Sequence, residues 1–243
     1  MYIKKKIFVF FLFAGFLVKG QSTYTDLSKE DAIKIFQKIN QWYTTTPSYS
    51  FTVTHATYAG YASIIPYEQK KGYFKKFTSG FHSNLADIQN IQSKNYLITI
   101  DSIKKIILLN NPLKKFEESN NVSIADYQKL LSKCTSLKIL NGKTKTLKIF
   151  FNKNYPINSY EICLNKDELF QSITVFYQRE VKSKTGAMVK PKLSIVFDDY
   201  NVKITPEKDE LNENKFFSAT TLQLKDFYAG YTLLDQRIKN NKQ

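Results

Sequence analysis

Few residues of this sequence combine a reactive side chain with a spacing that chemistry could use. The two histidines, His55 and His82, each lack a nearby nucleophile or an obvious acidic partner in the sequence. We interpret both as structural or surface residues. Asp198 and Asp199 could form a carboxylate pair, but neighbouring residues of a strand point to opposite faces of a sheet. For the aspartate pair we favour a role in a turn or at a strand end. His82 and this pair are the only candidate catalytic residues for a hydrolase.

Known catalytic and cofactor motifs are absent from the sequence. There is no phosphate-binding loop, no dinucleotide fingerprint, and no HExxH or GxSxG motif. The two cysteines and two histidines lack the spacing of zinc ligands. Cys134 and Cys163 could form a disulfide in an oxidising compartment or remain buried free thiols, and spacing alone does not decide. We therefore expect no catalytic residue, no metal and no cofactor, and we do not expect an enzyme.

The N-terminus has the pattern of a secretory signal peptide. Lys4, Lys5 and Lys6 precede a twelve-residue apolar stretch at residues 7–18, and Lys19-Gly20 leads into a polar segment. The apolar stretch is short for a membrane span, which needs about 20 residues. An uncleaved anchor is the alternative. The sequence predicts cleavage after Gly20 and export of a single domain formed by residues 21–243.

The charge of the chain indicates anionic partners but not nucleic acid. The formal net charge is +15, and all but two of the 36 basic residues are lysines, the exceptions being Arg179 and Arg237. Positive charge favours anionic surfaces, whereas bidentate recognition of phosphates and bases favours arginine. Abundant lysine is equally explained as a compositional habit of the source. Export also argues against nucleic acid as a partner.

The elements that would position any site are mostly strands. Ser28 can cap a helix whose apolar residues recur at three- and four-residue steps up to Tyr43, and Ser123 can cap a second helix that ends near Cys134. Between and after the helices we count roughly nine to eleven strands, many joined by short turns such as Asn141-Gly142. The order predicts an α+β fold in which helices cover one side of a curved antiparallel sheet.

Several strands are apolar on both faces. Residues 95–112, NYLITIDSIKKIILLNNP, predict a hairpin in which Ile106, Ile107, Leu108 and Leu109 follow one another without a polar break. A strand with one wet face would alternate apolar and polar residues. An ordinary sandwich with a thick core explains this pattern. The alternative is a curved sheet whose concave face lines an apolar ligand cavity.

The order of these segments resembles the periplasmic outer-membrane lipoprotein carrier family (LolA-like). The signal peptide, the amphipathic helix and SFTVTH come first, followed by KGYFKKF and the hairpin that ends at Asn111-Pro112. Next come a helix-bearing insertion and SYEICLNKDELFQSITVFYQ. PKLSIVFDDYNVKITPEKDELNENKFF and GYTLLDQR complete the series. Each motif is weak by itself, and the resemblance lies in their order from residue 28 to residue 237.

The resemblance implies an open β half-barrel covered by helices, with a cavity that takes lipoprotein acyl chains or another lipid. It implies receipt from an inner-membrane ABC release complex and delivery to an outer-membrane receptor, in the periplasm and without a nucleotide. The family has an arginine for lid control at the basic end of the glycine-led strand. The matching residue here is Lys75 or Lys76, which keeps the charge but lacks the planar fork of arginine.

We expect the cavity to be lined by apolar residues of six strand segments, and Ile100→Trp to displace its ligand. The expected lining is Phe74, Ile98, Ile100, Ile107, Leu109, Ile149, Phe151, Val175, Ile195 and Phe197. A one-residue register error would reverse the face of any of them. The function expected is that of a monomeric lipid carrier. The alternative is a non-enzymatic binding or scaffolding module on the same fold, which would hold an envelope protein and have a filled core.

Overall fold

The computed structural model describes residues 23–113, 124–183, 186–207 and 209–237. The predicted signal peptide, residues 1–20, and the predicted helix cap Ser123 lie outside these described residues. Within the described ranges, no helix has both the length and the apolar character that crossing a membrane requires.

The first helix forms where the sequence predicts it. Helix α1 spans Lys29–Thr45, and the Ser28 Oγ accepts a hydrogen bond from the backbone N–H of Asp31 at 3.0 Å. This bond satisfies one of the free N–H groups of the first turn. The buried residues of α1 are Ala32, Phe36 and Ile39, which recur at helical spacing. The predicted capping and stripe are therefore confirmed.

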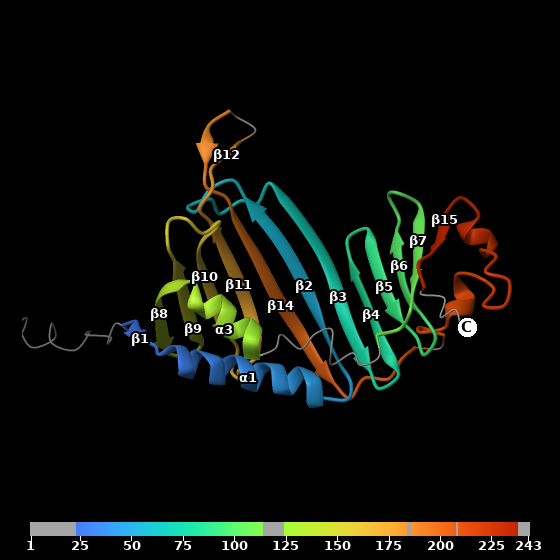
Figure 1. Cartoon of the computed structure of the whole chain (residues 1–243), viewed down its shortest axis with the longest axis horizontal. Helices are drawn as coiled ribbons and strands as arrows, with labels where there is room; N and C mark the ends of the chain where they lie inside the picture. The colour runs from blue at the N-terminus through green and yellow to red at the C-terminus, as the bar shows by residue number, and fades with distance from the viewer. Residues whose placement is uncertain (1–22, 114–123, 184–185, 208, 238–243) are drawn as a thin grey trace, which may run out of the picture.

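One large sheet contains most of the described chain (Figure 1). Its neighbours are antiparallel except for β7 and β15, which are parallel, and its edge strands β1 and β15 do not meet. In spatial order the strands are β1 (Thr25–Asp26), β8 (Cys134–Asn141), β9 (Lys145–Phe151), β10 (Ile157–Leu164), β11 (Phe170–Tyr177), β14 (Lys192–Val202), β2 (Tyr49–Tyr58), β3 (Glu68–Phe77), β4 (Gly80–Leu85), β5 (Ile88–Gln92), β6 (Leu97–Asp101), β7 (Ile106–Asn110) and β15 (Thr232–Asp235). A separate two-stranded ribbon pairs β12 (Val181–Lys182) with β13 (Met188–Val189). The predicted open, mainly antiparallel sheet is confirmed.

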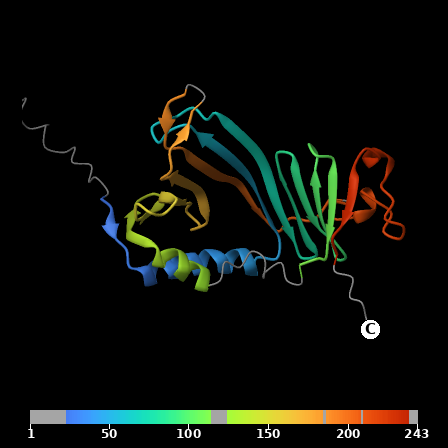
Figure 2. The ribbon, with the colours of Figure 1, turned by 45° about the horizontal axis from the view of Figure 1, so that its top comes forward.

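The helices cover one half of one face. α1 and α3 (Ile124–Ser132) lie side by side, and the sheet curves around them (Figure 2). Phe36 stacks on Tyr127 of α3 with ring centroids 5.1 Å apart. The core beneath the two helices is formed mainly by Phe36, Ile39, Leu131, Leu137, Leu147, Ile149, Phe151, Ile162 and Leu164.

A second core lies at the other end of the sheet, under the C-terminal segment (residues 203–237, of which residue 208 is not described). This segment contains two short 3-10 turns, Glu213–Lys215 and Asp226–Tyr228, and ends in β15. The buried residues of this core are Ile91, Tyr96, Ile98, Ile100, Ile107, Leu109, Phe216 and Phe217. The segment is therefore a largely irregular cover with one short strand.

The strand register places the two cores on opposite faces. Paired residues of antiparallel neighbours point to the same side of a sheet. Phe74 faces α1. Its partners across the sheet, one on each strand from β4 to β7, form a row on the same face: Ser83, Asn90, Thr99 and Leu108. The adjacent row, which starts at Lys75, faces the other way and contains His82, Ile91, Ile98 and Leu109. The second core is built on this outer row.

Two details of the predicted elements are corrected. Cys134 does not end the second helix, which stops at Ser132, but begins β8. Strands β4 and β5 were not predicted, because their sequences GFHSNL and IQNIQ carry too many polar residues to look like strands. Gly72 explains how β4 can lie against β3, since a Cβ at Gly72 would come within 2.0 Å of the carbonyl oxygen of Asn84.

Candidate functional site

An aromatic groove lies on the concave face, between the C-terminal half of α1 and the middle of the sheet. Its cavity volume is about 240 Å³. α1 contributes three residues, β2 two, and β3, α3 and β11 one each. The lining residues are Ile39, Asn40, Tyr43, Tyr49, Phe51, Phe74, Tyr127 and Phe170.

Stacked rings form the walls of the groove. The ring centroids of Phe51 and Phe74 are 5.4 Å apart, and those of Tyr43 and Phe170 are 6.2 Å apart. Phe197 of β14 extends this wall, with its ring 5.6 Å from that of Phe51. Aromatic rings at these distances form a continuous apolar surface. The groove therefore suits an apolar ligand better than a charged one.

The hydroxyl groups beside the groove are engaged with one another. The Tyr200 hydroxyl donates to the carbonyl oxygen of Phe170 at 2.8 Å and lies 2.6 Å from the Tyr43 hydroxyl, which donates to it. Burial raises the pKa of Tyr43, and burial also raises the pKa of Tyr200 to about 12. Both phenols are neutral at ordinary pH, so this wall of the groove carries no charge.

Lys76 connects the sheet to the last turn of α1. Its side chain is buried, and Nζ donates to the carbonyl oxygens of Tyr43 and Thr44 at 3.0 Å each. These are among the carbonyls that a helix leaves without an internal partner at its C-terminus, where a positive charge is also favourable. Lys76 thus holds the helix end that covers the groove, and its role in lid control stays a prediction.

A surface ion-pair network holds the middle of α1. Glu168, in the turn between β10 and β11, accepts hydrogen bonds from Lys145 of β9 and from Lys38 of α1. The bonds from Lys145 and Lys38 lower the pKa of the Glu168 carboxyl to about 2. The cover of the groove is therefore fastened at two points, by Lys38 and Lys76.

Six of the ten residues expected to line a cavity lie on the concave face. Phe74 lines the groove, Phe197 borders it and Ile195 is half-buried on the same face. Ile149, Phe151 and Val175 are buried, and the first two belong to the filled core beneath the helices. Sequence patterning identified these residues as apolar, but it missed Tyr43, Tyr49 and Phe51, which contribute more directly.

The other four expected lining residues are on the opposite face, so this part of the prediction is wrong. Ile98, Ile100, Ile107 and Leu109 are packed under the C-terminal segment. Lys75 also faces away from the groove and pairs with Glu210 at 2.8 Å, which excludes it as a contact of α1 in this structure. The register that reverses these residues could not be read from the sequence.

A second, polar pocket of about 370 Å³ lies on the outer face and contains a network that the sequence did not reveal. His82 Nδ1 is 3.0 Å from Glu210 Oε1, and His82 Nε2 is 3.1 Å from the Tyr73 hydroxyl. Burial raises the pKa of Tyr73, so its phenol is a poor nucleophile. The network fastens the C-terminal segment to β3 and β4. The expectation that the chain is not an enzyme stays a prediction.

The remaining residues with reactive side chains, Asp198, Asp199 and His55, do not form a common site. Asp198 and Asp199 are exposed on β14, where Asp199 accepts a hydrogen bond from Thr52. His55 is half-buried, and burial lowers its pKa. Among the described residues, no group of three or more His, Cys, Asp or Glu side chains could hold a metal ion.

Both cysteines are free thiols in the structure. Cys134 pairs in register with Phe151 of β9, and Cys163 pairs with Thr146 of the same strand. Five residues of strand separate these positions by about 16 Å, well beyond the span of a disulfide. Of the two alternatives, the structure has the free thiols.

Comparisons with known proteins give little further information. No protein-family model matches the chain, and no curated protein matches it. A DUF1329 family protein from Desulfovibrio piger is 8% identical, with a TM-score of 0.34, over 78% of this chain and 99% of that protein. A domain described as an outer membrane lipoprotein-sorting protein, from Vibrio parahaemolyticus, is 10% identical, with a TM-score of 0.30, over 77% of this chain and 98% of that domain. TM-scores this low support no conclusion about family or function, so the resemblance to lipoprotein carriers stays a prediction.

Proposed function

We propose that this chain binds the acyl chain of a lipoprotein or another lipid in the aromatic groove and carries it through the cell envelope. The observation that carries the proposal is the groove itself. It is lined by aromatic rings from five elements, bordered by neutral phenols and covered by a fastened helix. Burying an acyl chain there would contribute about 0.8 kcal/mol for each methylene group removed from water.

The size of the groove indicates how a ligand would enter. At about 240 Å³ it is smaller than the pockets of about 300–1,000 Å³ that enclose drug-sized ligands. In this closed form it has room for a segment of one acyl chain. A longer chain needs the C-terminal half of α1 to move away from β2 and β3, which requires the Lys76 contacts to break.

The resemblance to lipoprotein carriers supplies the wider context of the proposal. A carrier of this kind would act in the periplasm, take its cargo from an inner-membrane ABC release complex and deliver it to an outer-membrane receptor. The groove needs no nucleotide or metal to bind an apolar chain. These partners and this location belong to the proposal and are tested separately from lipid binding.

Lipid binding is tested on the purified full chain by two measurements. Native mass spectrometry after mild purification looks for co-purified lipid, and titration with a fluorescent fatty acid gives an affinity. Asn40→Trp places a large ring at the rim of the groove and is expected to weaken binding by about tenfold or more, because it occupies space that the chain needs. Lys34→Trp adds the same ring to the exposed face of α1 and is expected to bind as the unchanged protein does.

Two results would contradict the proposal. One is a folded protein that neither retains lipid nor binds the fatty acid. The other is equal binding by Asn40→Trp and Lys34→Trp, which would place the bound chain outside the groove. A filled, ligand-free core together with capture of an envelope protein would favour the scaffolding alternative.

A further inference from the structure

Large apolar side chains are exposed at one end of the molecule, where β2 turns into β3 and where the ribbon β12–β13 projects from the sheet (Figure 1). We call this end the tip and define it as residues 58–71 together with the described residues of 178–192. Ile64 is 88% exposed and Ile65 79%, in the loop between β2 and β3. The other exposed apolar residues of the tip are Tyr67, Val181 and Met188. Two adjacent isoleucines with this much solvent exposure are unusual on a protein surface that binds no partner or membrane.

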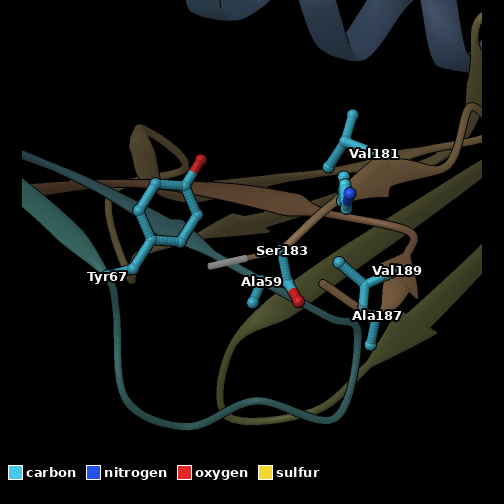
Figure 3. Close-up of a pocket in the computed structure, with 7 residues that line it drawn as sticks. Ala59, Tyr67, Val181, Ser183, Ala187 and Val189 are labelled. Atoms are coloured by element: carbon cyan, nitrogen blue, oxygen red, sulfur yellow. The ribbon is translucent and has the colours of Figure 1, made fainter. Parts of the chain in front are cut away.

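A shallow apolar groove joins the two parts of the tip (Figure 3). Its volume is about 360 Å³, and it lies between the β2–β3 loop and the β12–β13 ribbon. The residues that line it are Ala59, Tyr67, Val181, Lys182, Ser183, Ala187 and Val189. The exposed isoleucines belong to the same loop as Ala59 and Tyr67. The tip therefore combines an apolar groove with two exposed isoleucines, and it is contributed by two segments that are distant in sequence.

The two segments of the tip are also rich in positive charge. The tip has six basic residues in its described part, against Glu68 and Glu180. The six are Lys70, Lys71, Arg179, Lys182, Lys190 and Lys192. Glu68 is already paired with Lys70 at 3.1 Å. Lys192 donates to the carbonyl oxygen of Tyr61 at 2.8 Å and so fastens the loop to β14. An anionic partner would be attracted to this end of the molecule.

We propose that the tip docks on the surface of an anionic lipid bilayer, with Ile64 and Ile65 entering the interface and the lysines contacting the headgroups. Apolar burial and attraction to anionic lipid are the two contributions that together hold a protein on a membrane, where one alone is marginal.

The tip is separate from the aromatic groove. Phe51, in the groove, and Tyr58, at the tip, are seven residues apart in the extended strand β2, or about 23 Å. Membrane docking by the tip therefore does not require the proposed lipid groove. A protein that binds vesicles but not fatty acid would leave this inference standing while overturning the proposed function.

The test uses the full chain and vesicles of two compositions, one containing phosphatidylglycerol and one of phosphatidylcholine alone. We expect co-sedimentation with the anionic vesicles that weakens as salt rises, and little binding to the zwitterionic ones. The double variant Ile64→Ser/Ile65→Ser is expected to lose about tenfold or more of this binding while its fatty-acid affinity stays unchanged. Ile103→Ser is the matched control, because Ile103 is 72% exposed on the turn between β6 and β7, outside the tip.

A fluorescence measurement reports insertion directly and does not depend on a loss of binding. The variant Ile64→Trp is made in a Trp42→Phe background, so that residue 64 carries the protein's one tryptophan. On anionic vesicles we expect its fluorescence emission to shift to the blue and to be quenched by brominated lipids. The emission of Ile103→Trp in the same background is expected to show neither change. No binding to anionic vesicles would overturn the inference. Equal binding by the serine variants of Ile64/Ile65 and Ile103, or equal quenching at residues 64 and 103, would overturn it as well.

Discussion

Lys76 places a buried ammonium group against the last turn of α1, where two backbone carbonyls accept its hydrogen bonds. Replacing Lys76 by Met keeps the apolar stem and removes these donors. We expect the free energy of unfolding to fall by about 1–3 kcal/mol, because buried acceptors lose their partner. Amide hydrogen exchange in the last turn of α1 should become faster in Lys76→Met but not in Lys75→Met, since Lys75 faces the other side. Unchanged amide exchange in Lys76→Met would contradict the inference that Lys76 holds the end of α1 against the sheet.

Glu168 gives the molecule a predictable dependence on acid. Hydrogen bonds from Lys145 and Lys38 lower the pKa of Glu168 from 4.5 to about 2. A carboxyl whose pKa is lowered by folding stabilises the folded state above its unfolded pKa and loses this contribution as pH falls through its folded pKa. Glu168→Gln should therefore be less stable than the unchanged protein near pH 6, and this difference should vanish between pH 4.5 and about 2.

Urea unfolding of both proteins at several pH values measures the Glu168 effect. The comparison is needed because other carboxyls also titrate in this range. Lys38 is largely exposed, so added salt should shrink the difference at pH 6. A difference that persisted below pH 2 would mean that the glutamine variant disturbs packing and not charge.

At the scale of elements, the sequence predicts whatever depends on neighbouring residues. The helix cap at Ser28 is local, and it is where the sequence places it. The pairing of His82 with Glu210 is not local, because 128 residues separate the two. The aromatic groove is likewise assembled from α1, β2, β3, α3 and β11. Its residues could be recognised as apolar, but their meeting depends on the three-dimensional fold.

The C-terminal segment covers the second core, and two of its phenylalanines, one buried and one exposed, allow this role to be tested. Phe217 is fully buried in the second core, with its ring 5.3 Å from that of Tyr96, whereas Phe227 is 84% exposed. We expect Phe217→Ala to lower the free energy of unfolding by about 3–5 kcal/mol through the cavity it leaves. Phe227→Ala is expected to change it by less than about 0.5 kcal/mol. Denaturant unfolding measures both, and similar values for the two variants would mean that the segment is not a tight cover.

At the scale of the whole molecule, one sheet has a core on each face. The hairpin at residues 95–112 lacks a polar face for this reason: one of its rows packs under the C-terminal segment and the other is half-buried on the concave side. The apolar pattern indicated correctly that both faces avoid water. It could not indicate which row faces α1, because a shift of one residue exchanges the two faces.

The position of Ile100 allows a test of which face of the sheet carries the lipid site. From the sequence, Ile100→Trp was expected to fill the ligand cavity, but Ile100 is 4% exposed within the second core, on the face opposite the aromatic groove. We now expect Ile100→Trp to lower the free energy of unfolding by about 1–3 kcal/mol through overpacking. The affinity for a fluorescent fatty acid should be unchanged below the unfolding transition. Asn40→Trp should differ, with weaker binding of the fatty acid by the folded protein. If Ile100→Trp abolished binding in a folded protein, the lipid site would lie under the C-terminal segment, because only there would the new ring meet the ligand.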